Sequence, residues 1–216
     1  MTLEKLTAAL AARLTDEGAA WLAKARVQVS RDPAAIHVVS PAAGRHCGRG
    51  RIEGLRGGWT VDDAVRALLI AELPLGGAAL TEAIEELYWH GDAAEKRGVL
   101  RALSVLESRA EAGDGSREGF GDAFVPLVHD AVRTNDTRLI AAALGPYGAR
   151  HLDAAAYRQA VLKCLFTGIP LADISGVEDR VDDELVRMMS EFAQERISAG
   201  RVVPDDVWRF VPSPEA

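Results

Sequence analysis

The sequence contains few aromatic residues, few cysteines and little positive charge, and each shortage narrows the possible structures. Aromatic residues make up 6% of the 216 residues, whereas hydrophobic residues make up 48%, and much of that apolar content is alanine. Because alanine is the best helix former and a poor strand former, the composition favours an all-helical fold. A chain of this length buries roughly 70% of its extended-chain surface on folding, so it needs no covalent staple.

Motifs of common enzymes and metal sites are also missing. Cys47 and Cys164 belong to no CxxC pair, and the five histidines have neither HxxxH nor HExxH spacing. These spacings exclude a disulfide framework and the usual zinc signatures. The sequence has no GxSxG elbow, no GxxxxGK[ST] loop and no GxGxxG motif between a strand and a helix. We therefore expect no cofactor and no metal, and the motifs indicate no catalytic residue.

The net charge of −7 excludes some classes of partner. A protein that neutralises nucleic-acid phosphates normally has a basic face, so we expect no nucleic-acid partner. Acidic residues are concentrated in residues 173–206 and arginines in residues 45–57. This uneven distribution of charge either steers a partner or means only that the protein has two solvated faces of opposite charge. The most apolar stretch is broken by Arg66, Glu72 and Pro74 and is shorter than the ~20 residues of a membrane span. With no N-terminal leader pattern, the sequence predicts a soluble cytoplasmic protein.

Helical periodicity and capping signals recur along the chain. Thr60 with Asp63 resembles a capping box, Thr81 is expected to open the next helix, and Asp92 with Glu95 forms a second box-like cap. Farther along the chain, Asn135 or Asp136, then Asp153, then Asp182 are each expected to begin a helix. The pattern predicts about nine helices of roughly 10 to 18 residues joined by short turns. Short turns make neighbouring helices antiparallel, and turns recur at roughly 35 to 45 residues. We therefore predict an all-α fold, an irregular α-solenoid of stacked αα-hairpins similar to HEAT or armadillo repeats, or a compact bundle.

We expect one domain over residues 1–216, with a less regular part at 1–58 and a regular helical stack at 59–208. The longest irregular segment is predicted between Pro41 and Gly58, because it is rich in glycine and arginine. The glycine-rich segment 112–121 is the best candidate for a linker.

A polar cluster between two predicted helices is the first candidate binding site. Arg133, Asn135, Asp136 and Arg138 crowd one turn, although a single residue is enough to cap a helix. Two arginines beside a helix N-terminus suit an anion, whereas the same residues suit a structural network that joins two helices. Lys163 lies on an otherwise apolar helix and either reaches a groove or extends to solvent.

Two further groups of charged residues have the same two interpretations. Residues near the C-terminal helices form ion pairs that set helix register or add to a binding surface; they are Arg180, Glu195, Arg196 and Arg201. The segment between Gly44 and Arg51 forms either a backbone nest around an anion or a flexible basic loop; its cations are Arg45, Arg49 and Arg51.

The order of several motifs resembles the EboA family. The motifs are W-x-VDDAVRALLI, L-Y-x-x-GDAAEKRGVLRAL, AVRTND, YRQAVLKCLFTGIPL, DRVDDELVRMM and ERISAGR-x-V-P-x-D-x-W, from about Trp59 to Trp208. EboA-like proteins are encoded in bacterial clusters with a UbiA-type prenyltransferase, a TatD-like hydrolase, a sugar-isomerase-like protein and a dehydroquinate-synthase-like protein. In cyanobacteria such clusters are linked to moving a secondary-metabolite precursor across the inner membrane. The resemblance implies this pathway context and a location in the cytoplasm or at the inner membrane, but supplies no catalytic residues.

Two functions are compatible with these observations. The first is a non-catalytic helical adaptor or scaffold that docks a pathway enzyme, such as the prenyltransferase or the TatD-like hydrolase, or a membrane partner. The alternative is a small-molecule binding protein, or an enzyme, for an anionic isoprenoid-like or cyclitol-like metabolite. In the alternative, Arg133, Arg138, Lys163 and Arg201 would hold the anionic group.

Overall fold

The computed structural model describes residues 1–111 and 120–212, and the secondary structure of these residues is helical apart from one isolated β-bridge between Arg51 and Thr60. The α-helices are α1 (Leu3–Ala11), α2 (Asp16–Arg31), α3 (Ile36–Cys47), α4 (Val61–Ala71), α5 (Gly77–His90), α6 (Ala93–Glu111), α7 (Val125–Arg133), α8 (Thr137–Ala143), α9 (Pro146–His151), α10 (Ala154–Thr167), α11 (Val177–Arg180) and α12 (Asp183–Ser198). Three short 3-10 helices are η1 (Pro33–Ala35), η2 (Leu171–Asp173) and η3 (Asp205–Arg209). The all-helical prediction is confirmed.

The described residues contain twelve α-helices rather than about nine. Two additional helices, α9 and α11, are short, and α9 begins at Pro146, where a missing N–H group costs nothing. The prediction of an irregular segment from Pro41 is wrong for residues 41–47, which belong to α3. Buried Ile36, Val39 and Ala43 pack this helix into the core, and that packing outweighs the hydrogen bond lost at Pro41.

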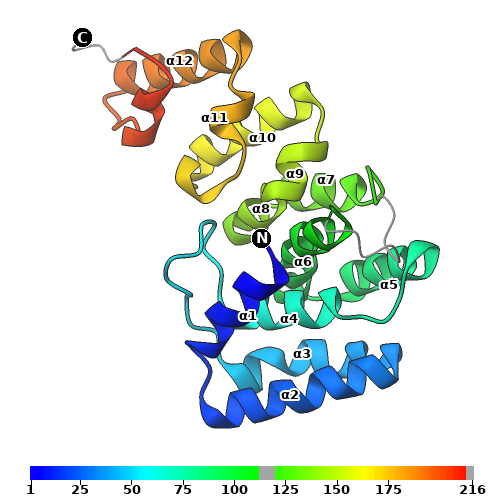
Figure 1. Cartoon of the computed structure of the whole chain (residues 1–216). Helices are drawn as coiled ribbons and strands as arrows, with labels where there is room; N and C mark the ends of the chain where they lie inside the picture. The colour runs from blue at the N-terminus through cyan, green and yellow to red at the C-terminus, as the bar shows by residue number, and fades with distance from the viewer. Residues whose placement is uncertain (112–119, 213–216) are drawn as a thin grey trace.

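Helix α4 lies at the centre of the N-terminal half. All of its residues from Val61 to Ala71 are buried, because α1, α2, α3 and α6 pack around it. In Figure 1, the α2–α3 pair lies on one side of α4 and α6 on the other. From α6 the contacts continue in chain order through α8 and α10 to α12. Helix α1 departs from this order by packing on both α4 and α6, and the repeat-like α-solenoid stays a prediction.

Most local capping predictions agree with the structure. Asp92 accepts hydrogen bonds from the Ala94 and Glu95 amides, and Glu95 accepts one from the Asp92 amide. Asp136, Asp153 and Asp182 cap α8, α10 and α12. The Thr60 capping box and the start at Thr81 are wrong. Thr60 makes no side-chain cap, and α5 begins at Gly77. Of the proposed linker 112–121, residues 112–119 lie outside the described part.

Among the described residues, we find no helix with the length and apolar character that a membrane span requires.

Gly98 allows α4 and α6 to approach closely. A methyl group at this position would lie 2.6 Å from Cβ and 2.7 Å from Cδ of Arg66, whose side chain is buried. Alanine is favoured over glycine inside a helix by about 1 kcal/mol. We nevertheless expect Gly98→Ala to lower the free energy of unfolding by about 1–3 kcal/mol, because Arg66 cannot move without losing its partners. Chemical denaturation measures this change.

Gly44→Ala is the matched control for this prediction. Its methyl group would lie 2.7 Å from Nε of Arg49, an exposed side chain that is free to move away. We expect this variant to be as stable as the wild type or slightly more stable. Equal stability of the two variants would show that α4 and α6 have more space between them than this geometry implies.

Candidate functional site

The buried charged side chains of the described residues all lie on two packed helices. They are Asp62, Asp63 and Arg66 on α4 and Arg97 and Arg101 on α6. Charged groups are almost never fully buried unless they are paired. Here three arginines accompany two aspartates, so one positive charge lacks a matching carboxylate within the set.

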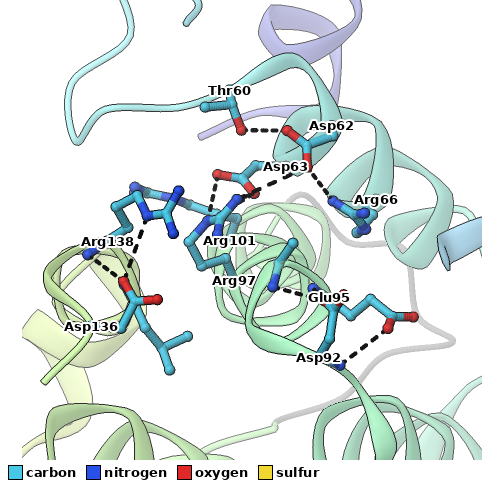
Figure 2. Close-up of polar contacts among 12 residues, drawn as sticks. Thr60, Asp62, Asp63, Arg66, Asp92, Glu95, Arg97, Arg101, Asp136 and Arg138 are labelled. Carbon is cyan, nitrogen blue, oxygen red and sulfur yellow. Dashed lines mark hydrogen bonds and ion pairs between the residues drawn. The ribbon is translucent and has the colours of Figure 1, made fainter. Parts of the chain in front are cut away.

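Two of the arginines have close carboxylate partners (Figure 2). Arg66 Nη1 donates to Asp62 at 2.6 Å, and Arg97 Nη2 lies 2.9 Å from Asp63. Thr60 Oγ1 donates to Asp62 at 2.7 Å and makes no capping hydrogen bond to the amides of α4. Burial alone raises the pKa of Asp62, but the Thr60 and Arg66 hydrogen bonds and the nearby arginine charges outweigh burial and lower that pKa. Asp62 is therefore held in its charged form.

Arg101 is the arginine without a matching carboxylate. Its side chain donates from Nη2 to the carbonyl oxygen of Gly57, and its guanidinium carbon lies 5.0 Å from the centre of the Trp59 ring. The residue is 5% exposed, and its Nε has no hydrogen-bond partner in the described part of the chain. Burial lowers the pKa of Arg101 to about 10, so the group still carries its charge at neutral pH.

Arg101 lines two cavities at once. The first has a volume of about 320 Å³, and Arg51, Arg97 and Arg138 contribute further positive charge to its wall. The second has a volume of about 380 Å³ and includes Trp59 in its wall. Both cavities are lined by Gly57, Arg101 and Asp173, so they adjoin at Arg101. We call the two cavities together the Arg101 cleft.

The segment between α3 and α4 forms one wall of the Arg101 cleft. The Ile52 amide donates to the Trp59 carbonyl at 2.8 Å, which folds residues 52–59 into a closed loop. Gly57 has a φ of +89°, and a Cβ atom there would lie 2.8 Å from Nη1 of Arg101. Only glycine allows this backbone to bend this way and to contact the buried guanidinium.

Two of the residues singled out in the sequence line the Arg101 cleft, Arg51 and Arg138. Arg51 Nη2 lies 4.0 Å from Asp173, and Arg138 Nε lies 3.7 Å from Asp136. Figure 2 shows Arg97 and Arg101 extending from α6 toward the side on which Arg138 lies. The cleft therefore combines residues from α1, α4, α6, α8, α9, α10 and η2 with residues of the segments that connect these helices.

The remaining members of the predicted polar turn lie outside the cavity walls. Arg133 is exposed at the end of α7, 3.8 Å from Asp130, and Asn135 is exposed in the turn. Asp136 accepts hydrogen bonds from the Arg138 and Leu139 amides and so caps α8.

Lys163 and Arg180 neutralise the ends of neighbouring helices. Lys163 Nζ donates to the carbonyl oxygens of Val132 and Thr134, both at 2.7 Å, at the C-terminus of α7. Arg180 donates to the Ala149 carbonyl at the end of α9 and also to that of Leu152, at 2.5 and 2.8 Å. A positive charge at a helix C-terminus satisfies free carbonyls and the helix dipole. Lys163 therefore neither extends to solvent nor reaches the Arg101 cleft.

Lys163→Met tests this structural role. We expect a loss of about 1–3 kcal/mol in the free energy of unfolding, because two partly buried carbonyl oxygens lose a charged hydrogen-bond donor. We expect no change in anion binding at the Arg101 cleft. Denaturation and calorimetry measure the two quantities, and weaker anion binding without loss of stability would contradict this assignment.

The other predicted site residues are scattered over the surface. Arg196 Nε donates to the Val202 carbonyl at 2.6 Å, and Arg201 is exposed. Glu195 lines a separate groove between α10 and α12. Arg45 lies in the last turn of α3 rather than in a loop, and Arg49 follows that helix. These five residues do not line the Arg101 cleft.

Sequence reasoning missed Arg97 and Arg101, the two arginines of α6 that line the cleft. A usable signal was present, because Asp62 with Arg66 and Arg97 with Arg101 are each four residues apart on helices. Helix α4 has no polar face on which its charges could be solvated. Such charges have to find partners inside the protein.

The fold and the site together define an all-helical protein with a buried ion network beside a cationic cleft. The chain belongs to the EboA family, because the family model described as metabolite traffic protein EboA matches residues 52–212. The match confirms the resemblance and includes Gly57 of the cleft wall. No curated protein and no solved structure matches the chain. The family description fits a role in metabolite handling.

Proposed function

We propose that the protein binds a small anionic metabolite in the Arg101 cleft as a non-catalytic step of metabolite handling. The observation that carries this proposal is Arg101, a buried guanidinium at the junction of two cavities with one N–H group unpartnered. An unpaired buried charge opposes folding. Its presence beside a cavity is explained when a bound anion supplies the missing partner.

The charge around Arg101 also favours an anion. Four arginines and two aspartates line the first cavity in a chain whose net charge is −7. Attraction between charges is stronger in a partly buried site than in water, because the surroundings are less polarisable. A bidentate arginine contact adds geometric selectivity for carboxylate or phosphate groups.

Binding without catalysis fits the side chains around the cleft. Neither cavity is lined by histidine or cysteine among the described residues. Asp63 is paired with Arg97, and Asp173 lies 4.0 Å from Arg51. The cleft therefore contains several cations that hold an anion but few groups suited to moving a proton.

Titration with simple anions tests the proposal. We expect phosphate, sulfate or citrate, at constant ionic strength with chloride as reference, to bind in calorimetry and to raise the melting temperature. Arg101→Met should abolish the effect, whereas Arg133→Met should keep it, because Arg133 is exposed outside the cleft. If none of these anions binds, or if both variants bind equally, the proposal fails.

A groove between α10 and α12 favours the adaptor as a second function. The groove has a volume of about 310 Å³ and is lined by apolar residues including Leu162, Phe166 and Met188. Phe166 is 59% exposed, which is unusual for a large apolar side chain and typical of interaction surfaces. In this role the irregular helical stack would form one domain that docks a partner in the cytoplasm or at the inner membrane.

Copurification tests the adaptor function. Tagged wild-type protein is expected to retain the prenyltransferase or the TatD-like hydrolase encoded with it, and Phe166→Asp is expected to lose the same protein. Arg133→Met serves as a surface control. Equal retention by wild type and Phe166→Asp would exclude this groove as the docking site.

A further inference from the structure

We propose that the ligand of the Arg101 cleft is a phosphorylated metabolite with an apolar body, its phosphate in the first cavity and its body in the second. This inference rests on the proposed function, that the cleft binds a small anion. It adds the charge and the shape of that anion, both argued from the two cavity walls.

The wall of the first cavity suits a doubly charged group. Arg97 is paired with Asp63 at 2.9 Å. Arg51 and Arg138 are exposed and lie 4.0 and 3.7 Å from their nearest carboxylates, so Arg101 and one of these two arginines can serve a ligand together. Arg138 is exposed and lies 3.7 Å from Asp136, so it can turn toward a ligand. Two available guanidinium groups match the charge of a phosphate monoester better than the single charge of a carboxylate.

The wall of the second cavity adds large apolar side chains. They are Leu55, Trp59, Pro146 and Ile174, and they lie beside the cationic side chains of Lys5, Arg56 and Arg101. Leu55 is half-buried and Pro146 is exposed, so part of the apolar surface is accessible from the cavity. A ligand that consisted of an anion alone would leave these apolar side chains without a contact.

Arg101 joins the two requirements. Its guanidinium lines both cavities and lies against the Trp59 ring, 5.0 Å from the ring centre. A phosphate bound to Arg101 in the first cavity would therefore place a directly attached body next to Trp59 in the second. Gly57, Arg101 and Asp173 line both cavities, so a ligand that reached from one to the other would pass these three residues.

Calorimetry with four small probes tests the inference. The probes are inorganic phosphate, phenyl phosphate, benzoate and phenol, at neutral pH and constant ionic strength. We expect phenyl phosphate to bind about tenfold or more tightly than inorganic phosphate, because its ring buries apolar surface. Benzoate has a similar body but one charge and should bind at least about tenfold more weakly than phenyl phosphate. Phenol alone should not bind measurably.

Two variants separate the contributions of the cavities. Arg138→Gln should weaken phosphate and phenyl phosphate by the same factor, because both use the first cavity. Leu55→Asn should weaken phenyl phosphate and leave inorganic phosphate unchanged, because Leu55 lines only the second cavity. Both positions are in part accessible to solvent, so we expect both variants to fold.

The outcomes distinguish this inference from the proposed function. If phenyl phosphate binds no more tightly than phosphate, the proposal that the ligand has an apolar body is wrong, and the proposed anion site is retained. If benzoate binds as tightly as phenyl phosphate, the proposal that the ligand has a phosphate group is wrong. If no anion binds, both proposals fail. Sedimentation with vesicles rich in phosphatidic acid separates a soluble ligand from a lipid headgroup; vesicle binding that Arg101→Met abolishes would overturn the soluble metabolite.

Discussion

Replacing Arg101 with methionine is expected to weaken anion binding strongly while leaving the protein as stable as the wild type or more stable. Arg101 is buried, and its Nε lacks a hydrogen-bond partner in the described part of the chain. Methionine fills similar space without a charge, and replacing a poorly compensated buried charge is neutral or stabilises by about 1–4 kcal/mol. Loss of a charged hydrogen-bond donor should weaken anion binding by roughly 10-fold to 150-fold.

Denaturation and calorimetry on the same samples measure both effects of Arg101→Met. A variant that loses several kcal/mol of stability would show that Arg101 has a structural role through Gly57 and Trp59. A variant that keeps full anion affinity would remove Arg101 from the binding site. Arg133→Met controls for a general loss of positive charge, because Arg133 is exposed and lines neither cavity.

The stability difference between Arg101→Met and the wild type should also depend on pH. Burial lowers the pKa of Arg101 to about 10, below its ordinary value of 12.5. Between these values the unfolded chain binds more protons than the folded one, so the stability contribution of Arg101 rises with pH. Its unfavourable contribution is complete below about pH 10. The stability advantage of Arg101→Met should therefore be constant from neutral pH up to about pH 10 and shrink above about pH 10.

Replacing Asp62 with alanine is expected to destabilise the protein strongly. Asp62 accepts hydrogen bonds from Thr60 and Arg66, and Arg66 is 2% exposed. Removing one partner of a buried ion pair costs about 3–5 kcal/mol, because the other charge stays buried and unpaired. At about 2–4 °C for each kcal/mol in a protein of this size, the melting temperature should fall by roughly 6–20 °C. Thermal and chemical denaturation measure the loss.

A double variant and a surface pair provide the controls. Asp62→Ala with Arg66→Met should recover most of the stability, since the two changes together leave no additional unpaired buried charge. Glu72→Ala breaks a more exposed, bidentate pair with Arg26, at 2.7 and 2.5 Å, in which the Arg26 side chain is 44% exposed. We expect it to cost about 1 kcal/mol or less. Equal losses for Asp62→Ala and Glu72→Ala would contradict the importance of burial.

The Asp62 contribution should disappear in acid. Its hydrogen bonds and neighbouring arginines lower the pKa of Asp62 below the ordinary value of 3.8. The stabilisation is therefore fully present above that ordinary value and is lost as the pH falls below it. Wild type and the double variant should approach each other in stability at the acid end of the titration.

Structural features that depend on composition or on residues close together in the sequence could be predicted. Alanine-rich composition predicted an all-helical chain, and the caps at Asp92, Asp136, Asp153 and Asp182 bond amides two or three residues away. The prediction at Pro41 was wrong, because it weighed the glycine and arginine content of the segment without the packing of α3 on α2 and α4. Local propensity is a weak guide wherever tertiary burial opposes it.

The candidate site depends on contacts between distant residues. Asp63 was interpreted as part of a helix cap, yet it pairs with Arg97, 34 positions along the chain. Arg101 bonds a carbonyl 44 positions away, and Arg138 joins the cavity from α8. Lys163 was a candidate ligand group, but α7 ends beside it and uses its charge. In each case the side chain alone did not specify its partner.

By itself, the sequence determined the helical class and the membership of the EboA family. These properties follow from composition, periodicity and motif order, which are local along the chain. The tertiary structure decided which arginines have a carboxylate partner, which one lies between two cavities, and which predicted site residues serve helix ends instead. The physical reason is that burial and pairing are set by the packing of α4, α6 and α8, which brings together residues far apart in sequence.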